Sequence, residues 1–332
     1  MWPRVLAGIT VLLFVTILPS KLDLNKNEAI FFRTVNQGQD WQAVTELKKA
    51  ERVLDLALNP QNPSEIYLAS EKGLYVSFDN GKSWQVKEIK ISNQVIEDLV
   101  IYQIAVDPVD SRNIYLATYL DGYGQALASY DKGKSWRALY ISTFQKEPFY
   151  ALGVNMSQEI YLAGASGDLL KSANFGQSWQ VVKKINEAIL QINLTDSEIY
   201  IRTSNEIFKK SNEKWQELEI EARQINDFIT TERNLYLASN KGFFKSNNKG
   251  KSWQEIKVAA SGEEVSKVAV DLNNFYNLYC SVGANLYFSY DNGQSWQMKK
   301  FSENIEEILV NLKNKDIIYV GTSSSNKILN LF

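Results

Sequence analysis

The chain has 332 residues, a net charge of −2 and 45% hydrophobic residues. Its 36 basic and 38 acidic residues are interspersed, so it has no basic stripe of the kind that nucleic-acid-binding proteins display. It has no histidine and one cysteine, which excludes His-based catalytic triads, His or thiolate metal sites and internal disulfides. We therefore expect no metal, no cofactor and no nucleic-acid partner.

Residues 1–20 differ in composition from the rest of the chain. Arg4 precedes an apolar run from Val5 to Leu18. A run of about 14 apolar residues suits a secretory signal peptide, whereas a membrane-spanning helix usually needs about 20. No A-x-A cleavage site follows the run. We expect an exported, extracytoplasmic protein that is either secreted after cleavage or anchored to the membrane by this segment, and the missing cleavage site favours the anchor.

Residues 21–29 form a short polar tether, and residues 30–332 show no further change of composition. This second part repeats one eight-residue stretch with the pattern S-x-D-x-G-x-S-W. Five copies are clear, and they are Ser77–Trp84, Ser129–Trp136, Ser172–Trp179, Ser246–Trp253 and Ser289–Trp296. A degenerate copy covers Thr34–Trp41, and a shortened one ends at Trp215.

Each residue type in this box has a physical role in a tight turn. An Asp or Asn side chain can accept hydrogen bonds from the turn backbone, Gly supplies a positive φ, and Trp offers a large apolar area to the outgoing strand. Because these residues recur in unit after unit, we interpret them as structural rather than as catalytic residues or calcium ligands. The structural positions are Asn36, Gly38, Trp41, Asp79, Gly81, Trp84, Asp131, Gly133, Trp136, Asn174, Gly176, Trp179, Trp215, Asn248, Gly250, Trp253, Asp291, Gly293 and Trp296.

A second repeat gives the same count of seven. A tyrosine preceded by Ile or Leu recurs at Tyr67, Tyr115, Tyr161, Tyr200, Tyr236, Tyr279 and Tyr319. The box tryptophans follow one another at intervals of 36 to 52 residues, close to the period of a propeller blade. Each unit contains an inner strand A, a strand B with the tyrosine, a strand C leading into the box and a strand D that begins at the tryptophan. The sequence therefore predicts an all-β fold, a seven-bladed β-propeller of four-stranded antiparallel blades.

The order of the first and last units predicts how the ring closes. Trp41 precedes every tyrosine of the second repeat, and Tyr319 follows every box tryptophan. One blade should therefore combine strands C and D from the N-terminal end with strands A and B from the C-terminal end, which removes two exposed sheet edges. Residues 328–332 form a second candidate for strand C of that blade.

The boxes connect strands C and D, so they lie on one face of the ring, here called the box face. The B–C and D–A connections share the other face, here called the loop face. The stretch Thr118–Gln125 is interpreted as a long B–C loop, and the connection after it is rich in aromatic residues. Such side chains on a rigid scaffold suit recognition, although they could instead cover the blade edge. The candidate binding residues are Tyr119, Asp121, Tyr123, Tyr140, Phe144, Phe149 and Tyr150.

The repeated box resembles the Asp-box, or BNR repeat, of β-propeller proteins. Residues 30–332 resemble the seven-bladed photosystem II assembly-factor-like propellers in length, in a single domain behind an N-terminal hydrophobic segment and in the lack of catalytic groups. More distantly, the run from Tyr67 to Ser77 is similar to the xyloglucanase-type propellers, and the boxes resemble those of the sortilin-type receptors. The resemblance implies a non-catalytic scaffold that binds protein partners and assists assembly of an envelope or membrane complex.

The alternative is a carbohydrate-active protein, either a glycan binder or a glycoside hydrolase. Hydrolysis would need two carboxylates on either side of a glycosidic bond. Asp121 and Asp168, on neighbouring blades, are the candidate catalytic pair. We expect no enzymatic activity, because no other catalytic constellation is present.

Overall fold

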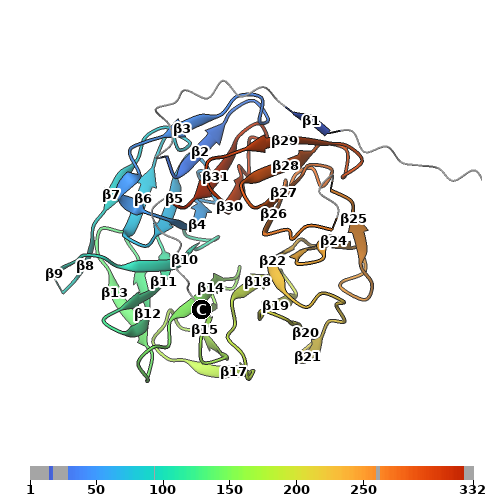
Figure 1. The fold of residues 1–332 in the computed structure, drawn as a ribbon. Helices are drawn as coiled ribbons and strands as arrows, with labels where there is room; N and C mark the ends of the chain where they lie inside the picture. The colour runs from blue at the N-terminus through green and yellow to red at the C-terminus, as the bar shows by residue number, and fades with distance from the viewer. Residues whose placement is uncertain (1–14, 18–28, 93, 259–261, 325–332) are drawn as a thin grey trace, which may run out of the picture.

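Seven sheets are arranged in a ring (Figure 1) in the computed structural model, which describes residues 15–17, 29–92, 94–258 and 262–324. Each sheet is built on four antiparallel strands, each paired with the next in a meander. Every inner strand contacts the inner strands of both neighbouring sheets, so the seven blades close on themselves. The predicted seven-bladed propeller is confirmed.

The strands are assigned to blades in chain order. Blade one contains β4 (Val53–Leu58), β5 (Ile66–Ser70), β6 (Gly73–Ser77) and β7 (Gln85–Lys87). Blade two contains β10 (Val100–Val106), β11 (Ile114–Leu120), β12 (Tyr123–Ser129) and β13 (Arg137–Ile141). Blade three contains β14 (Phe149–Val154), β15 (Ile160–Gly164), β16 (Asp168–Ser172) and β17 (Gln180–Lys184). Blade four contains β18 (Gln191–Leu194), β19 (Glu198–Arg202), β20 (Ile207–Ser211) and β21 (Lys214–Glu217).

The remaining blades follow the same pattern. Blade five contains β22 (Ile225–Thr230), β23 (Leu235–Ser239), β24 (Gly242–Ser246) and β25 (Gln254–Ile256). Blade six contains β26 (Lys267–Val270), β27 (Leu278–Val282), β28 (Asn285–Ser289) and β29 (Trp296–Lys300). Blade seven contains β30 (Ile305–Val310), β31 (Ile318–Thr322), β2 (Phe31–Thr34) and β3 (Gln42–Val44). A short 3-10 helix, Lys48–Ala50, joins blade seven to blade one.

Blade seven closes the ring by combining the two ends of the described chain. β2 pairs antiparallel with β31, with Phe31 opposite Gly321 and Thr34 opposite Ile318. In Figure 1 the blue strands β2 and β3 lie beside the dark red β30 and β31. The predicted closure is confirmed, and β2 fills the position of strand C. The competing segment 328–332 lies outside the described residues.

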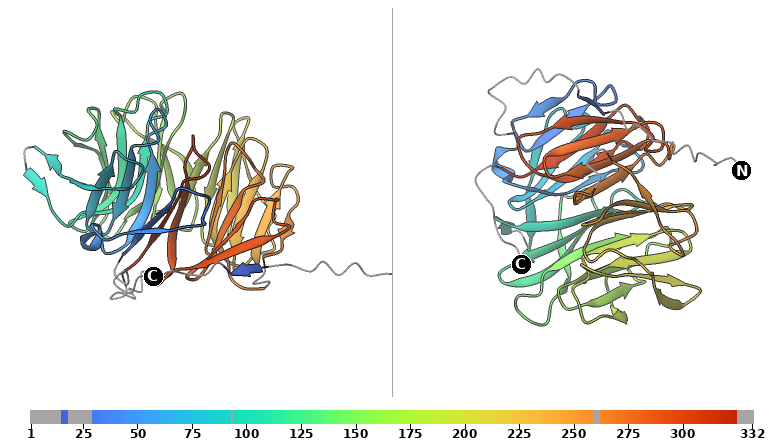
Figure 2. Two further views of the ribbon diagram at one scale, coloured as in Figure 1. Left: turned by 90° about the horizontal axis from the view of Figure 1, so that it is seen from above. Right: turned by 45° about the vertical axis from the view of Figure 1, so that its right-hand side comes forward.

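The N-terminal segment is described only in part. β1 (Val15–Ile17) pairs in parallel with β29 and adds a fifth strand to the outer edge of blade six (Figure 2). The rest of the expected signal or anchor, and the tether up to residue 28, lie outside the described residues. Among the residues that are described, no helix is long and apolar enough to cross a membrane.

The hydrophobic core is divided into seven clusters, one at each junction between neighbouring blades. Every cluster contains one box tryptophan and one tyrosine of the second repeat. At the junction of blades seven and one, for example, Trp84 and Tyr319 both contact Phe31, with ring centroids 4.9 and 6.0 Å from it. The two sequence repeats therefore mark the packing surfaces between blades, and burial of these large side chains is the main stabilising term.

The box turns are held together by their own side chains. In the turn between β6 and β7, Asp79 Oδ1 accepts hydrogen bonds from the N–H groups of Lys82 (3.0 Å) and Ser83 (2.9 Å). The Gly81 N–H donates to Ser77 Oγ at 2.8 Å. Gly81 has a φ of 75°, and a Cβ there would lie 3.1 Å from the Phe31 ring. Only glycine satisfies both the backbone conformation and this contact.

Asp79→Ala is expected to lower the free energy of unfolding by about 1–2 kcal/mol, because it removes the acceptor for several turn hydrogen bonds. Asp79→Asn is expected to cost less than about 0.5 kcal/mol. In the equivalent turn Asn174 keeps the same backbone contact, with Oδ1 2.9 Å from the Ser178 N–H. Urea unfolding of the two variants measures the difference. An equal loss in both would mean that the charge of Asp79, rather than its acceptor geometry, stabilises the turn.

Blade two differs from its predicted form. The expected long loop 118–125 is wrong, because β11 and β12 continue as paired strands to a two-residue turn at Asp121 and Gly122. Both turn residues have positive φ, 52° and 86°. The long interval before the blade-two tryptophan instead contains an extra hairpin, β8 (Ile89–Ile91) and β9 (Gln94–Ile96). The blade-two hairpin therefore forms a rigid extension on the loop face.

Candidate functional site

Three tyrosines from blades two and three come together at the loop-face end of the inner strands. Tyr102 and Tyr150 occupy the bulges of β10 and β14, and their ring centroids are 5.1 Å apart in an edge-to-face arrangement. Burial raises the pKa of Tyr102 to about 12, and the nearby phenols of Tyr150 and Tyr119 raise it further. The Tyr102 phenol therefore stays neutral and available for hydrogen bonding at physiological pH. Tyr119 and Tyr150 were candidates from the sequence, whereas Tyr102 was missed.

The blade-two extension and the segment after it carry the exposed members of the expected set. Asp121 is exposed at the tip of the extension, and Tyr123 is half-buried at the start of β12. Phe144 follows β13 and is 67% exposed. Together with the three tyrosines, these side chains form the surface that we call the aromatic surface: Tyr102, Tyr119, Asp121, Tyr123, Phe144 and Tyr150.

Two other candidates are packed into the junction between blades two and three. Phe149 is 4% exposed, and its ring centroid lies 5.7 Å from that of Tyr140. Tyr140 in turn contacts Trp179 at 5.8 Å. These contacts belong to the hydrophobic core, so Phe149 and Tyr140 support the aromatic surface from below and offer a ligand little area.

The two candidate catalytic carboxylates are placed differently. Asp168 begins β16 opposite Lys184 in β17, whose Nζ lies 3.1 Å from Asp168 Oδ1. Asp121 is at the exposed tip of the blade-two extension, on a different blade from Asp168. Asp168 is therefore engaged in an ion pair with the neighbouring strand of its own blade.

Side chains of the inner strands join neighbouring blades around the axis. Asp55 Oδ2 accepts a hydrogen bond from the Ile104 N–H of blade two at 2.8 Å. Asp227 Oδ2 accepts one from the Val268 N–H of blade six at 3.1 Å. Gln103 makes the equivalent contact from blade two to blade three, at 2.6 Å. These bonds link the inner strands directly and help to hold the ring closed.

Ionisable groups from the consecutive blades five, six, seven and one act on one another here. Lys267 Nζ lies 3.0 Å from Glu307 Oε2. Burial raises the pKa of Glu307 to about 7; Lys267 opposes this shift, and the carboxylates of Asp55 and Asp227 add to it. Burial likewise raises the pKa of Asp55 to about 6. Within the described residues, no group of three or more His, Cys, Asp or Glu side chains could hold a metal ion.

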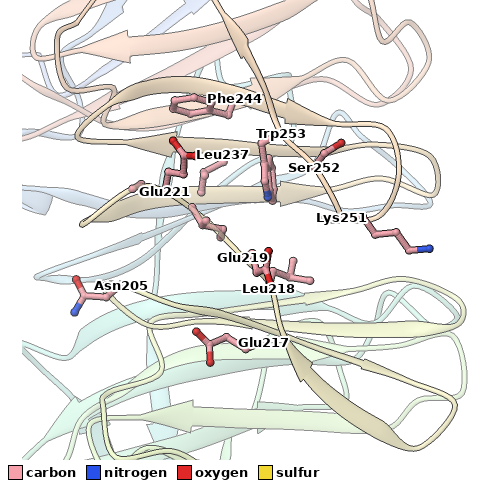
Figure 3. Close-up of a pocket in the computed structure, with 12 residues that line it drawn as sticks. Asn205, Glu217, Leu218, Glu219, Glu221, Leu237, Phe244, Lys251, Ser252 and Trp253 are labelled. Atoms are coloured by element: carbon pink, nitrogen blue, oxygen red, sulfur yellow. The ribbon is translucent and has the colours of Figure 1, made fainter.

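A hollow of about 590 Å³ lies at the outer junction of blades four and five (Figure 3). Its lining includes Trp253, whose Nε1 is buried without a hydrogen-bond partner. Three carboxylates line it as well, but Glu217, Glu219 and Glu221 are spread along one segment instead of converging (Figure 3). Lys251 points away from them in the same view. The hollow offers apolar area and one indole donor, without a constellation that could perform chemistry.

Comparison with known proteins identifies the family. A family model described as photosynthesis system II assembly factor YCF48 matches residues 33–323. The fold is similar to that of a structure described as YCF48 bound to D1 peptide, with a TM-score of 0.67 and 14% identity, covering 89% of this chain and 97% of that one. It is also similar to YCF48 from Cyanidioschyzon merolae, with a TM-score of 0.66 and 12% identity, covering 82% and 96% of the two chains.

A GH74 xyloglucanase from Xanthomonas campestris is similar as well, with a TM-score of 0.68 and 16% identity. That match covers 88% of this chain but 52% of the enzyme, so this chain corresponds to about half of it. No curated protein matches the sequence. Structural likeness at such low identity shows the propeller fold, whereas the family model spans nearly the whole ring. The chain therefore belongs to the photosynthesis system II assembly factor YCF48 family.

Proposed function

We propose that this protein is a non-catalytic scaffold that binds a segment of a protein partner and assists assembly of a membrane or envelope complex. The observation that carries the proposal is the match of the assembly-factor family model to residues 33–323. A YCF48 propeller that is similar over 89% of this chain has been seen bound to D1 peptide. The partner of this chain is proposed only as a protein segment, since fold does not determine the ligand.

The aromatic surface is the proposed binding site. Aromatic side chains dominate the energetics of protein interfaces, because each buries a large area at a small cost in conformational entropy. Phe144 and Tyr119 stand on the blade-two extension and the segment after it, which the bulged inner strands of blades two and three support. Asp121 at the tip adds one exposed carboxylate to the edge of this surface.

We also propose that the protein is exported and tethered to the membrane by residues 1–20. The support for this is the apolar run from Val5 to Leu18, preceded by Arg4 and without a cleavage site after it. A tether would keep the propeller beside partners in the membrane. Fractionation of the full chain into membrane-bound and released forms tests the tether separately from partner binding.

A double variant, Tyr119→Ala with Phe144→Ala, is expected to weaken partner binding at least about tenfold, because two interface anchors are lost. The full chain is crosslinked to its neighbours in membranes of the source cells, and the recovered protein is identified and titrated against the purified variants. Phe78→Ala is the matched control, since Phe78 is 57% exposed but lies in a box turn on the opposite face. It is expected to bind like the wild type.

Two results would contradict the proposal. The first is equal affinity of the wild type and the double variant for the recovered partner. The second is release of reducing ends from polysaccharides by the purified protein, which would establish the carbohydrate-active alternative. Because both substituted side chains are partly or largely exposed, circular dichroism of the double variant should show an unchanged fold.

A further inference from the structure

A group of three side chains recurs on the box face of blades three and four. In blade three, Lys171 Nζ lies 2.7 Å from Glu159 Oε1, and the Tyr161 hydroxyl donates to Glu159 Oε2 at 3.0 Å. The same ammonium lies 5.7 Å from the centroid of the Tyr161 ring. One carboxylate therefore satisfies two donors, a lysine from strand C and a tyrosine from strand B.

Blade four repeats this arrangement around a buried glutamate. Glu198 is 7% exposed, and its Oε1 lies 2.9 Å from Lys209 Nζ. Its Oε2 accepts a hydrogen bond from the Tyr200 hydroxyl at 2.7 Å. Lys249 reaches over from the box of blade five and lies 3.0 Å from Oε1. Burial would raise the pKa of Glu198, but these three hydrogen bonds outweigh it and hold the pKa below its ordinary value.

Blade five keeps the lysine and the tyrosine but lacks the glutamate. Lys245 stands opposite Tyr236 in the strand register, and its Nζ lies 5.5 Å from the ring centroid. Asn234 occupies the position of the glutamate, in a turn built like that of blade four. The Asn234 N–H donates to Thr231 Oγ1 at 2.9 Å, as the Glu198 N–H does to a threonine at 3.1 Å.

The box of blade six also has a neutral residue in place of a charged one. Asn292 stands in the box of blade six where Lys249 stands in the box of blade five. Its Oδ1 accepts a hydrogen bond from Lys245 Nζ at 3.1 Å. At the junction of blades four and five, two lysines surround Glu198. At the junction of blades five and six, Lys245 is accompanied by the neutral amides Asn234 and Asn292. The site has lost one negative and one positive charge, and one lysine remains.

The remaining donors are incompletely satisfied. Lys245 has no carboxylate partner among the residues that the structure describes, and burial lowers its pKa. The Tyr236 hydroxyl is buried and makes no hydrogen bond, although the Asn234 side chain lies close enough to affect its pKa. A buried donor without an acceptor costs free energy, and a partly buried ammonium without a counter-charge does so as well. A carboxylate beside Lys245 would supply the missing counter-charge.

Lys245 and Asn234 line a hollow that solvent can reach, whereas the buried Tyr236 does not. The hollow has a volume of about 550 Å³ and is lined by Arg233, Asn234, Lys245, Asn247, Phe275, Tyr276 and Asn292. Arg233 is exposed and adds a second positive charge, and it also lines an adjoining hollow that contains Asp196 and Glu232. Tyr276 is 61% exposed and is shared with an adjoining hollow of about 750 Å³. The surface therefore combines positive charge at its base with exposed apolar area beside it.

We propose that the box-face junction of blades five and six is a carboxylate-binding site for an acidic peptide segment. The carboxylate pairs with Lys245 from the hollow, beside Asn234, in the way that Glu198 pairs with Lys209 at the preceding junction. Arg233 contacts the same group or the next acidic residue, and Tyr276 packs against the peptide backbone. The site lies on the face opposite the aromatic surface, so it goes beyond the proposed function and is tested separately.

The test uses the full chain labelled with ¹³C-lysine and three short peptides. Acetyl-Gly-Asp-Gly-amide offers a side-chain carboxylate, acetyl-Gly-Gly-Gly offers a C-terminal one, and acetyl-Gly-Asn-Gly-amide offers neither. The Lys245 ¹³Cε signal is expected to shift saturably with at least one of the first two peptides and to remain unchanged with the third. Whichever of the two carboxylate peptides binds more tightly identifies the source of the carboxylate.

Substitution of Asn234 provides the matched pair of variants. Asn234→Glu places a carboxylate where Glu198 has one, so it is expected to weaken peptide binding at least tenfold by occupying the site. Asn234→Gln remains neutral and is expected to bind within about threefold of the wild type. Lys257→Met removes an exposed lysine nearby and serves as a charge control. The double variant of the aromatic surface is expected to bind these peptides like the wild type.

The proposal is overturned if both carboxylate peptides shift the Lys245 signal no more than the asparagine peptide does. It is also overturned if Asn234→Glu binds as tightly as Asn234→Gln, because the donors would then not converge on that position. Sodium chloride at matched ionic strength must not reproduce the shift, since a general salt effect would equally contradict a site. Each outcome is read at Lys245 itself and does not depend on recovery of a natural partner.

Discussion

Phe31→Ala is expected to lower the free energy of unfolding by about 3–5 kcal/mol. Phe31 is fully buried on β2, the strand that completes blade seven. Its ring contacts Trp84 and Tyr319 and also fills the space beside Gly81. Truncation would therefore leave a cavity at the junction where the two ends of the chain meet. No covalent bond closes the ring there, so the packing of β2 has to do so.

Equilibrium unfolding in urea, followed by tryptophan fluorescence, measures this loss. Phe144→Ala is the matched control, because the same substitution at a side chain that is 67% exposed should change stability by less than about 0.5 kcal/mol. A loss below about 1 kcal/mol for Phe31→Ala would mean that β2 is dispensable and that the ring closes in another way. A loss in the expected range, together with faster unfolding, would show that the closing blade limits the stability of the whole ring.

The number of blades and the closing strands could be predicted from the sequence because equivalent positions in a propeller share one environment. Trp84 and Tyr319 meet at one junction, and an equivalent pair meets at each of the other six. A large aromatic side chain is needed at each of these places, so the sequence repeats it. The same argument gives the glycine of the box, since its positive φ and its contact with the preceding blade recur as well.

The insertions could not be assigned in the same way because they occur once. The extra hairpin β8–β9 shows only a short alternation from Ile89 to Ile96, which is too short to separate from a loop. The Asp121-Gly122 pair, by contrast, is a strong signal for a two-residue hairpin turn, and it predicts the extension of blade two correctly when it is given priority over loop length. The error lay in interpreting residues 118–125 as a loop instead of as two paired strands.

The candidate surface shows a different limit of sequence analysis. Phe144 and Phe149 are five positions apart in one aromatic segment, yet one is exposed and the other is buried. Tyr102 was missed because a bulge in β10 changes the alternation of the strand, and the bulge leaves no clear mark in the sequence. Contacts at the axis are still harder to predict from the sequence, because Lys267 and Glu307 lie on different blades and Asp55 lies on a third.

The axial charges lead to a prediction about pH. In the folded chain, burial raises the pKa of Glu307 to about 7 and that of Asp55 to about 6, from ordinary values of 4.5 and 3.8. Raised folded-state values mean that the folded protein binds protons more tightly than the unfolded chain does. The stabilisation from these two groups is therefore complete below about pH 4 and is lost as the pH rises through 6 and 7. The free energy of unfolding is expected to fall by about 1–3 kcal/mol between pH 5 and 8.

Glu307→Gln is expected to remove most of this pH dependence, because the amide stays neutral throughout the range. The adjacent Glu306→Gln is the matched control; it breaks an ion pair with Arg52 at 2.7 Å but leaves Glu307 in place, so the slope should persist. The box aspartates do not interfere, since turn hydrogen bonds outweigh their burial and hold the pKa of Asp79 and Asp131 at about 2. Urea unfolding at pH 5, 6, 7 and 8 measures the slope. If Glu307→Gln retains the slope of the wild type, the proton that stabilises the fold is bound at a group other than Glu307.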